Sequence, residues 1–199
     1  MRIDWDVPIP MDDGIVLRAD VFRPDDGGRY PVIMTYGPYG KWLAFQDGFE
    51  RQWANLKTEH PDALAGSSGL QMNWETVDPE KWVPAGYAVI RVDSRGAGRS
   101  PGHLDIFSPR ESRDYYLCIE WAAAEPWCTG KVGLRRPGRR SADAQRSHHL
   151  HTRGNFEGYA RAASTSKWLE VHGLQHWVEF YTDYGVRLQK RFFGRFSSW

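Results

Sequence analysis

The sequence is poor in the features that mark several common classes of protein. Its 199 residues include two cysteines, Cys118 and Cys128, which are too few for a disulfide scaffold or a cysteine-only zinc site. The formal net charge at pH 7 is +1, so no overall basic field exists to attract nucleic acid. No apolar run approaches the roughly 20 residues that a membrane helix needs, and the N-terminal segment has no apolar signal region. These absences predict a soluble, cytoplasmic protein with neither a nucleic-acid nor a membrane partner.

Aromatic residues, in contrast, are abundant, with ten tryptophans in a chain long enough for about one domain. Burying so many large rings requires a substantial core, so the composition indicates a globular protein. From Ile15, apolar and polar residues alternate over IVLRADVFRP, which predicts a half-exposed strand. Two continuous apolar runs, at 31–37 and from Tyr87 to about Asp93, predict fully buried strands.

A helix is predicted after these strands, and its start is clearly marked. Ser108 stands at the N-cap position, Pro109 at the first helical position and Glu111 three residues after the cap. Pro126 ends the helix, and its inward face recurs at helical spacing through Asp114, Leu117, Cys118, Trp121 and Ala122. A short strand follows at 131–134. Strand, helix and strand in this order predict a βαβ crossover, a parallel sheet and an α/β fold.

The remaining segments are less regular. We expect 42–81, which is rich in tryptophan and interrupted by glycine, to form an excursion over the strand ends. Residues 135–148 are rich in arginine and show no apolar period. A strand is predicted at 167–173. An amphipathic helix is predicted at 181–196, with four residues recurring at a spacing of four: Tyr184, Leu188, Phe192 and Phe196.

One segment, GRSPG at 98–102, matches the nucleophile-elbow pattern G-x-S-x-G with Ser100 at its centre. We do not expect Ser100 to be a nucleophile, because an elbow serine lies directly between a strand and a helix, and this strand ends near Asp93. The oxyanion hole also uses the backbone N–H of the residue after the serine, and Pro101 has none.

Three histidines, at 148, 149 and 151, resemble a metal cluster only in their proximity. Their spacing fits no standard site, and no carboxylate or cysteine lies near them at ligand spacing, so we expect a solvated loop. The sequence therefore predicts no metal and no cofactor.

Two residues follow strands at the edge where ligands and catalytic groups collect in open α/β sheets. His176 comes just after 167–173, and Tyr39 comes just after 31–37. His176 is either a functional group of that cleft or an ordinary surface or core histidine. Tyr39 either donates a hydrogen bond into the cleft or packs as an aromatic side chain. The residues alone leave both alternatives open.

Four segments resemble consecutive motifs of the cocaine-esterase (CocE/NonD) and X-prolyl dipeptidyl-peptidase-like acyl hydrolases: PMDDGIVLRADVFRP, YPVIMTYGPYGK, GYAVIRVDSRGAGRSPG and IEWAAAEPWCTGKVGL. Residues 150–196 resemble a later part of the same family. The resemblance implies an α/β-hydrolase fold, a Ser-Asp-His triad, and a small acyl ester or peptide as substrate. It also implies that Tyr39 matches the tyrosine that stabilises the oxyanion and that His176 matches the triad histidine.

The family pattern fails where the nucleophile should stand. After GKVGL the family continues with a turn of the type xGxSY, whereas this chain continues with Arg135, Arg136, Pro137 and Gly138. Ser141 comes several residues later in a different context, RRSADA. The triad acid cannot be assigned, since Asp143 lies in the same arginine-rich stretch.

We therefore expect an incomplete α/β-hydrolase domain that lacks the nucleophile elbow, the cap region and the family's C-terminal β-sandwich. Residues 1–134 would form its N-terminal part, 135–148 an aberrant junction, and 149–199 its C-terminal part. The simplest explanation is an internal deletion with a disturbed reading frame across about 135–148. Apolar surface uncovered by such a deletion predicts poor solubility or self-association.

Three functional hypotheses remain. The first is a serine hydrolase by family that is itself inactive for lack of a nucleophile. The second is a non-catalytic α/β binding module that uses the tryptophan-rich segment 42–82. The third is a weak esterase with a displaced nucleophile, Ser141 or Ser100.

Overall fold

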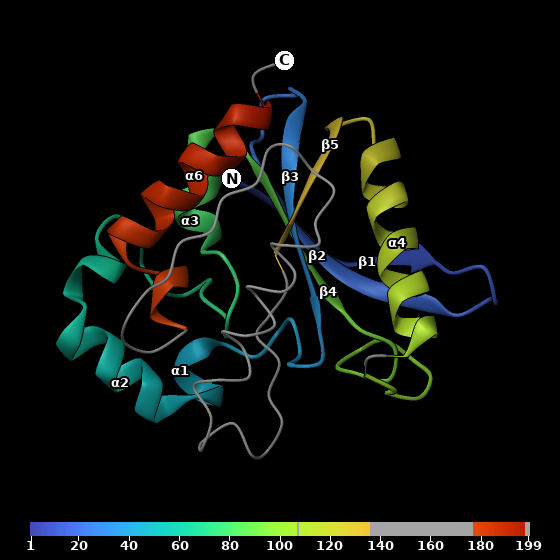
Figure 1. The fold of residues 1–199 in the computed structure, drawn as a ribbon, viewed down its shortest axis with the longest axis horizontal. Helices are drawn as coiled ribbons and strands as arrows, with labels where there is room; N and C mark the ends of the chain where they lie inside the picture. The colour runs from blue at the N-terminus through green and yellow to red at the C-terminus, as the bar shows by residue number, and fades with distance from the viewer. Residues whose placement is uncertain (107, 136–176, 198–199) are drawn as a thin grey trace, which may run out of the picture.

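The fold is built on a β-sheet with helices on both faces (Figure 1). The computed structural model describes residues 1–106, 108–135 and 177–197. Within them, five strands lie in the order β1-β2-β4-β3-β5. Their bounds are β1 (Arg2–Pro10), β2 (Val16–Arg23), β3 (Tyr30–Gly37), β4 (Ala88–Asp93) and β5 (Cys128–Arg135). The four strands that the sequence predicts in this part of the chain are confirmed.

The sheet is mixed rather than parallel, which corrects one expectation. β3 pairs in parallel with both β4 and β5, as the βαβ crossover predicts. β1 and β2 are joined by a short turn and pair antiparallel, and β2 also runs antiparallel to β4. A tight turn reverses the chain direction, so two adjacent strands that it joins must be antiparallel.

The helices form a layer on each side of the sheet. In Figure 1, α4 covers one face, while α3 and α6 lie on the other side with α1 and α2 beyond them. Their bounds are α1 (Phe45–Gly48), α2 (Glu50–Glu59), α3 (Pro79–Trp82), α4 (Pro109–Ala124) and α6 (Asp183–Ser197). Short 3₁₀ turns are η1 (Pro61–Leu64), η2 (Val83–Ala85) and η3 (Val178–Phe180).

Helix α4 begins and ends where the sequence predicts. The Ser108 hydroxyl accepts a hydrogen bond from the backbone N–H of Glu111 at 3.0 Å, which satisfies one donor at the helix start. The last helical residue is Ala124, two residues before Pro126. The predicted inward face is confirmed, because Asp114, Cys118 and Ala122 are fully buried.

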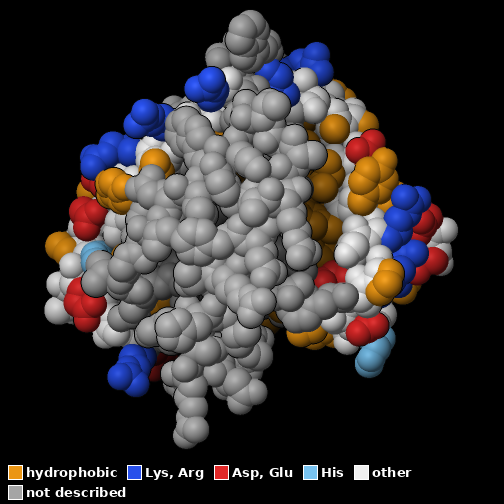
Figure 2. Space-filling model, viewed as in Figure 1, with side chains coloured by type: hydrophobic (Ala, Val, Ile, Leu, Met, Phe, Trp, Pro, Cys, Tyr) orange, Lys and Arg blue, Asp and Glu red, His pale blue; other side chains and the backbone are white. Residues whose placement is uncertain are grey.

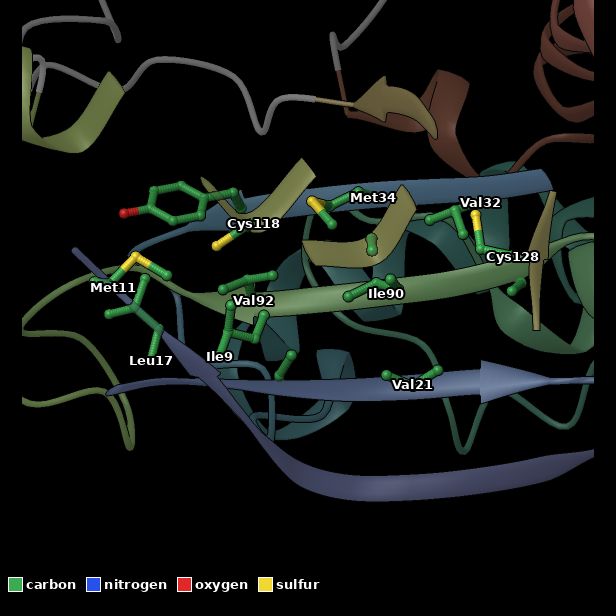
Figure 3. Close-up of a cluster of buried hydrophobic side chains, with 14 residues drawn as sticks. Ile9, Met11, Leu17, Val21, Val32, Met34, Ile90, Val92, Cys118 and Cys128 are labelled. Carbon is green, nitrogen blue, oxygen red and sulfur yellow. The ribbon is translucent and has the colours of Figure 1, made fainter. Parts of the chain in front are cut away.

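The sheet face beneath α4 is apolar (Figure 3). Alternate residues of neighbouring strands point into one cluster, as the period of two along a strand requires. The cluster includes Leu17 and Val21 of β2, Val32 and Met34 of β3, Ile90 and Val92 of β4, and Cys118 and Cys128. Each large side chain buried in this way stabilises the fold by roughly 1.5–3 kcal/mol relative to exposure.

Segment 42–81 is more regular than the sequence suggests. It contains α1, α2, η1 and the start of α3, and its aromatic side chains form a second core. Phe45 and Trp74 pack there with Trp177 and Tyr181, which lie more than 100 residues further along the chain. The Tyr181 hydroxyl accepts from the Glu75 N–H at 2.7 Å and donates to the Asn73 carbonyl at 2.8 Å. α2 was not predicted, although Phe49, Trp53 and Leu56 recur at helical spacing and pack on this core.

Two further elements differ from expectation. β1 is not predicted at all, and it is an edge strand that contains Pro8 and Pro10; proline is tolerated at a sheet edge because its missing N–H faces away from the ladder. The predicted amphipathic helix is confirmed as α6, but its buried side differs. Tyr184 is half exposed, whereas Val186 is buried and Phe193 packs on the cluster around Trp82.

The strand predicted at 167–173, nearly all of the junction 135–148 and the three clustered histidines lie outside the described residues. In the described part of the chain, no helix combines the length and apolar character needed to cross a membrane.

Candidate functional site

Tyr39 lies at the edge of the sheet where β3 and β4 both end. These strands are parallel, and Gly37 at the end of β3 is paired with Asp93 at the end of β4. The Ser94 N–H donates to the Gly37 carbonyl at 3.0 Å and closes the two strand ends together. Tyr39 is the second residue beyond β3, so the position expected for a group at the carboxyl edge is confirmed.

The Tyr39 side chain is half buried against the aromatic core. Its ring meets Phe49 edge to face, with 6.4 Å between ring centroids. Tyr39 also lines a cavity of about 20 Å³ with Lys41, Asn73, Thr76 and Arg91. A space of this size holds about one water molecule. Within the described residues, Tyr39 therefore borders a tight polar niche rather than a substrate-sized pocket.

A row of buried polar residues crosses the sheet beside this niche. Asp20 of β2 and Thr35 of β3 flank Arg91 of β4, since each is its direct partner in the ladder. The Arg91 guanidinium donates to the carbonyls of Gln71 and Val77 at 2.7 and 3.0 Å. Burial lowers the pKa of Arg91 to about 10, which leaves it protonated at neutral pH. Arg91 thereby attaches the chain between α2 and α3 to the centre of the sheet.

A larger cavity, of about 210 Å³, lies on the α4 side of the same edge. It shares no lining residue with the niche at Tyr39. Its walls come from the end of β3, the loop after β4 and the first turn of α4, and they include Tyr36, Ser94, His103, Arg95 and Arg110. Both arginines are ion-paired with the buried carboxylate of Asp114.

The stretch that forms these features matches a known family. Residues 13–135 match the family described as X-Pro dipeptidyl-peptidase (S15 family), which is more than half of the chain. The chain belongs to the S15 family. This is a family of serine hydrolases that includes esterases and peptidases, so the resemblance seen in the sequence motifs is confirmed.

Two relatives show the extent of the match. The cocaine esterase of Rhodococcus sp. strain MB1 Bresler is 30% identical over 132 residues, which are 64% of this chain and 18% of that protein. A CocE/NonD family hydrolase from Staphylococcus aureus, known from its crystal structure, superposes with a TM-score of 0.76 at 25% identity. That superposition covers 96% of this chain and 49% of the other. The chain thus spans about a fifth of the esterase and half of the S. aureus hydrolase, and it shares the α/β fold of the latter.

Within this S15 framework, Ser100 has a structural environment. Its hydroxyl donates to the Asp93 carbonyl at 2.7 Å and accepts from the Arg18 N–H at 3.0 Å, and the residue is 5% exposed. β4 ends at Asp93 and α4 begins at Pro109, so Ser100 lies in a long loop between them. A buried hydroxyl with both functions used holds the loop against β2 and is poorly placed to attack a substrate.

The strand that should deliver the nucleophile is present. β5 pairs with β3 from Tyr30 opposite Cys128 to Thr35 opposite Arg135. Because the two strands are parallel, β5 ends at the edge where Tyr39 lies, and it is longer than the predicted 131–134. The other predicted catalytic candidates, His176 and Ser141, and the acid candidate Asp143 lie outside the described residues.

The cysteines are not alternative nucleophiles. Both are fully buried in the apolar cluster beneath α4. Burial, with a smaller contribution from the negative charge of Asp114, raises the pKa of Cys118 to about 12, and burial also raises the pKa of Cys128. A thiol that stays protonated and has no access to solvent is unreactive.

In the three described ranges, no three His, Cys, Asp or Glu side chains come together as a metal site would require. Acidic and basic side chains lie side by side along the α4 edge in Figure 2, where Asp12 is ion-paired with Arg110 and Arg113. Charges of both signs therefore neutralise each other on this part of the surface.

Sequence reasoning missed the residues that hold the Tyr39 loop. Asp93 accepts a hydrogen bond from the Lys41 N–H at 2.6 Å, and the Asn73 amide donates to the carbonyls of Gly40 and Lys41 at 3.1 and 3.0 Å. These partners lie 32 to 52 residues apart along the chain. A buried lysine in the quoted motif YGPYGK was the one signal available, since a buried charge needs partners.

Proposed function

We propose that this chain derives from a CocE/NonD-type serine hydrolase acting on acyl esters or peptides, and that the chain itself is catalytically inactive. The observation that carries this proposal is the end of β5. The strand runs parallel to β3 as far as Arg135, at the edge where Tyr39 lies. The sequence then continues with Arg136, Pro137 and Gly138, and no serine stands where the family's nucleophile turn would place one.

The remaining site residues take their roles from the chemistry of acyl transfer. In such an enzyme the serine oxygen attacks the acyl carbonyl carbon, a histidine accepts the serine proton, and donors stabilise the oxygen that becomes negative. We assign the Tyr39 hydroxyl as one of those donors and His176 as the base. Loss of one oxyanion donor typically lowers kcat by about 10²–10³-fold.

The missing serine has a larger effect. Removal of a triad serine costs on the order of a million-fold in rate, because no covalent acyl-enzyme can form. A residual acceleration of roughly 10³–10⁴ over water remains where binding and oxyanion stabilisation survive. We therefore expect slow hydrolysis of an activated ester at most, without a burst of acyl-enzyme.

A fluorophosphonate probe and p-nitrophenyl acetate test the proposal. We expect no labelling of the folded protein and no burst with the ester. Labelling that disappears in Ser141→Ala but persists in Ser100→Ala would overturn the proposal and establish a displaced nucleophile. Labelling lost in Ser100→Ala alone would point instead to the loop after β4.

Residual ester hydrolysis, if measurable, separates the two assigned groups. We expect Tyr39→Phe to lower it and His176→Gln to leave it unchanged, because the rate that remains without the serine comes from binding and oxyanion stabilisation. The unlabelled, folded protein would also be compatible with a binding module. A defined partner recovered with the intact chain and lost on substitution of exposed Trp42 would favour that alternative.

The internal deletion stays a proposal, supported by the abrupt arginine-rich composition of 135–148 between two family-like segments. Sequencing the encoding DNA across and beyond this junction tests it. An intact reading frame that expressed relatives share, with the same junction, would contradict a deletion. Self-association likewise stays a prediction, and sedimentation velocity of the purified chain would check it.

A further inference from the structure

Lys41 carries a buried ammonium group two residues beyond Tyr39. Its side chain is 3% exposed and lies 2.8 Å from Asp20 Oδ1 and 3.0 Å from Asp6 Oδ1. Burial alone would lower the pKa of Lys41, but its hydrogen bond to Asp20 and its ion pair with Asp6 raise it. The group is therefore a permanent cation, held between one fully buried and one half-buried carboxylate.

The backbone around Lys41 is held as tightly as its side chain. The Lys41 N–H donates to Asp93, and both carbonyls of the Gly40–Lys41 pair accept from the Asn73 amide. Gly40 itself has a φ of +79°, a conformation that L side chains rarely adopt. Asp93 of β4 and Asn73 of the chain before α3 thus hold the backbone next to Tyr39, while Asp6 of β1 and Asp20 of β2 hold the Lys41 side chain.

Asp6 reaches Lys41 through an irregularity in β1. The register with β2 shifts between Asp4 and Val7, and Asp6 has a φ of +57°. The Asp6 N–H donates to Asp20 Oδ1 at 2.9 Å instead of to the ladder. A bulge of this kind re-aims a side chain, and a left-handed non-glycine residue is a sparsely populated state that persists only where its surroundings hold it.

Asp93 joins the Lys41 segment to the glycine-rich loop after β4. Its second oxygen accepts the Arg99 N–H at 2.9 Å. Gly98, with a φ of +52°, lies so close that a Cβ there would collide with the Asp93 carboxylate. Asp93 therefore receives one backbone N–H from each of the two loops that leave this edge of the sheet.

We propose that Lys41 and Asp93 are positioning residues that set the place of the Tyr39 hydroxyl, and that the bulged Asp6 and buried Asp20 hold Lys41 for this purpose. The proposal rests on the oxyanion role proposed for Tyr39. Such a donor must be kept within about 0.5 Å of its productive position, so the peptide that carries it needs anchors close by. Because the backbone is held two residues away, the Tyr39 hydroxyl can move only through the intervening backbone torsions and the two torsions of its own side chain.

Fluorine NMR of 3-fluorotyrosine placed at position 39 tests this directly and requires no activity. Lys41→Met and Asp93→Asn are expected to move the resonance toward that of free fluorotyrosine. Fluorotyrosine at Tyr116, which is exposed on α4, should not respond. Arg113→Met removes an exposed cation that is paired with Asp12 and lies over the Tyr116 ring, so it serves as the matched control by moving the Tyr116 signal and leaving the position-39 signal unmoved.

Asp6→Asn provides a variant that should fold even if Lys41→Met does not, because it removes only the outer, half-buried partner. We expect a smaller shift in the same direction. An unchanged position-39 resonance in Asp6→Asn and Asp93→Asn, with native circular dichroism, would overturn the proposal. An equal shift of the position-39 resonance in Arg113→Met would overturn it as well, since the response would then be general.

The two proposals fail in different measurements. A shifted resonance, together with unchanged ester hydrolysis in Tyr39→Phe, would support the positioning role of Lys41 and Asp93 and remove the oxyanion role of Tyr39. An unmoved resonance would contradict the positioning role of Lys41 and Asp93, whatever the hydrolysis assay shows.

Discussion

The two faces of the sheet are built from the same strands but by different physical means. The face beneath α4 is covered by aliphatic side chains and two thiols (Figure 3). The opposite face combines Phe22, Ile33 and Val89 with the buried polar row of Asp20, Arg91 and Thr35. Both kinds of residue alternate along single strands, so each strand contributes to both faces.

The difference shows that one face of the sheet mainly stabilises the fold, whereas the other also fixes the course of the chain that packs on it. Apolar contacts depend on area and shape, and they carry no directional requirement. A buried guanidinium must find specific acceptors, because leaving it unpaired is costly. The apolar face therefore requires only a helix of complementary shape. Arg91 instead donates hydrogen bonds to two particular carbonyls, those of Gln71 and Val77, and these bonds fix the course of the chain near Tyr39.

Arg91→Met should give the largest effect and would break the polar face alone. It removes two hydrogen bonds from a charged donor and leaves two carbonyls buried, which should cost about 4 kcal/mol of unfolding free energy. Urea unfolding gives this quantity. Hydrogen exchange should also accelerate in 65–78 more than in α4; equal acceleration of both regions would contradict the placement role.

Ile90→Ala should break the apolar face instead, at a cost of about 3 kcal/mol for the lost contacts and the cavity left behind. Ile90 is adjacent to Arg91 in β4 but points to the other side, into the cluster with Met34 and Cys118. We expect no preferential exchange in 65–78. Selective loss of protection there would show that the two faces are not independent.

Ser108→Ala tests the start of the helix that covers the apolar face. Loss of the cap to the Glu111 N–H should cost about 1 kcal/mol. Ser112→Ala is the control, since Ser112 is exposed on the same turn and should change stability by less than about 0.5 kcal/mol. Equal losses in the two variants would argue against the cap.

The smallest effect should be on the acid dependence of stability in Asp12→Asn. Hydrogen bonds from Arg113 and Arg110 hold the pKa of Asp12 below its usual value of 3.8, so its contribution is present above that value and is lost as pH falls through the lower, folded-state pKa. Burial raises the pKa of Asp93, so its protonation on acidification acts in the opposite direction. The urea midpoint should thus fall less steeply below pH 4 in Asp12→Asn than in the parent chain; an identical slope would contradict this.

Predictability followed the regularity of each segment. β2, β3, β4 and α4 could be read from period and capping because their own residues carry the signal. β1 was missed although Ile3, Trp5, Val7 and Ile9 alternate with other residues, because the two prolines at its end argue against a strand unless the strand is known to lie at a sheet edge. α2 has only two apolar side chains longer than alanine, Trp53 and Leu56, among ten residues, which is a weak signal. The buried side of α6 depends on Trp82 and Tyr87, which lie about a hundred residues earlier.

The candidate site divides in the same way. Tyr39 was proposed because it follows a buried strand and matches a family motif; the structure shows its position beside the paired ends of β3 and β4, while its role stays a prediction. The hydrogen bonds by which Asp93 and Asn73 hold the Gly40–Lys41 backbone were not predicted. Each of these hydrogen bonds joins residues that are distant in sequence, and no local pattern records such a contact.

By itself, the sequence determined the strands and the helix whose apolar period is local, the family to which the chain belongs, and the absence of serine from positions 135–140. Only the tertiary structure decided that the sheet is mixed, that Ser100 is a buried loop anchor, and that an aspartate on a bulge reaches the lysine beside Tyr39. The reason is physical: backbone periodicity is a short-range property, whereas the partner of a buried charge is chosen by the packing of the whole chain.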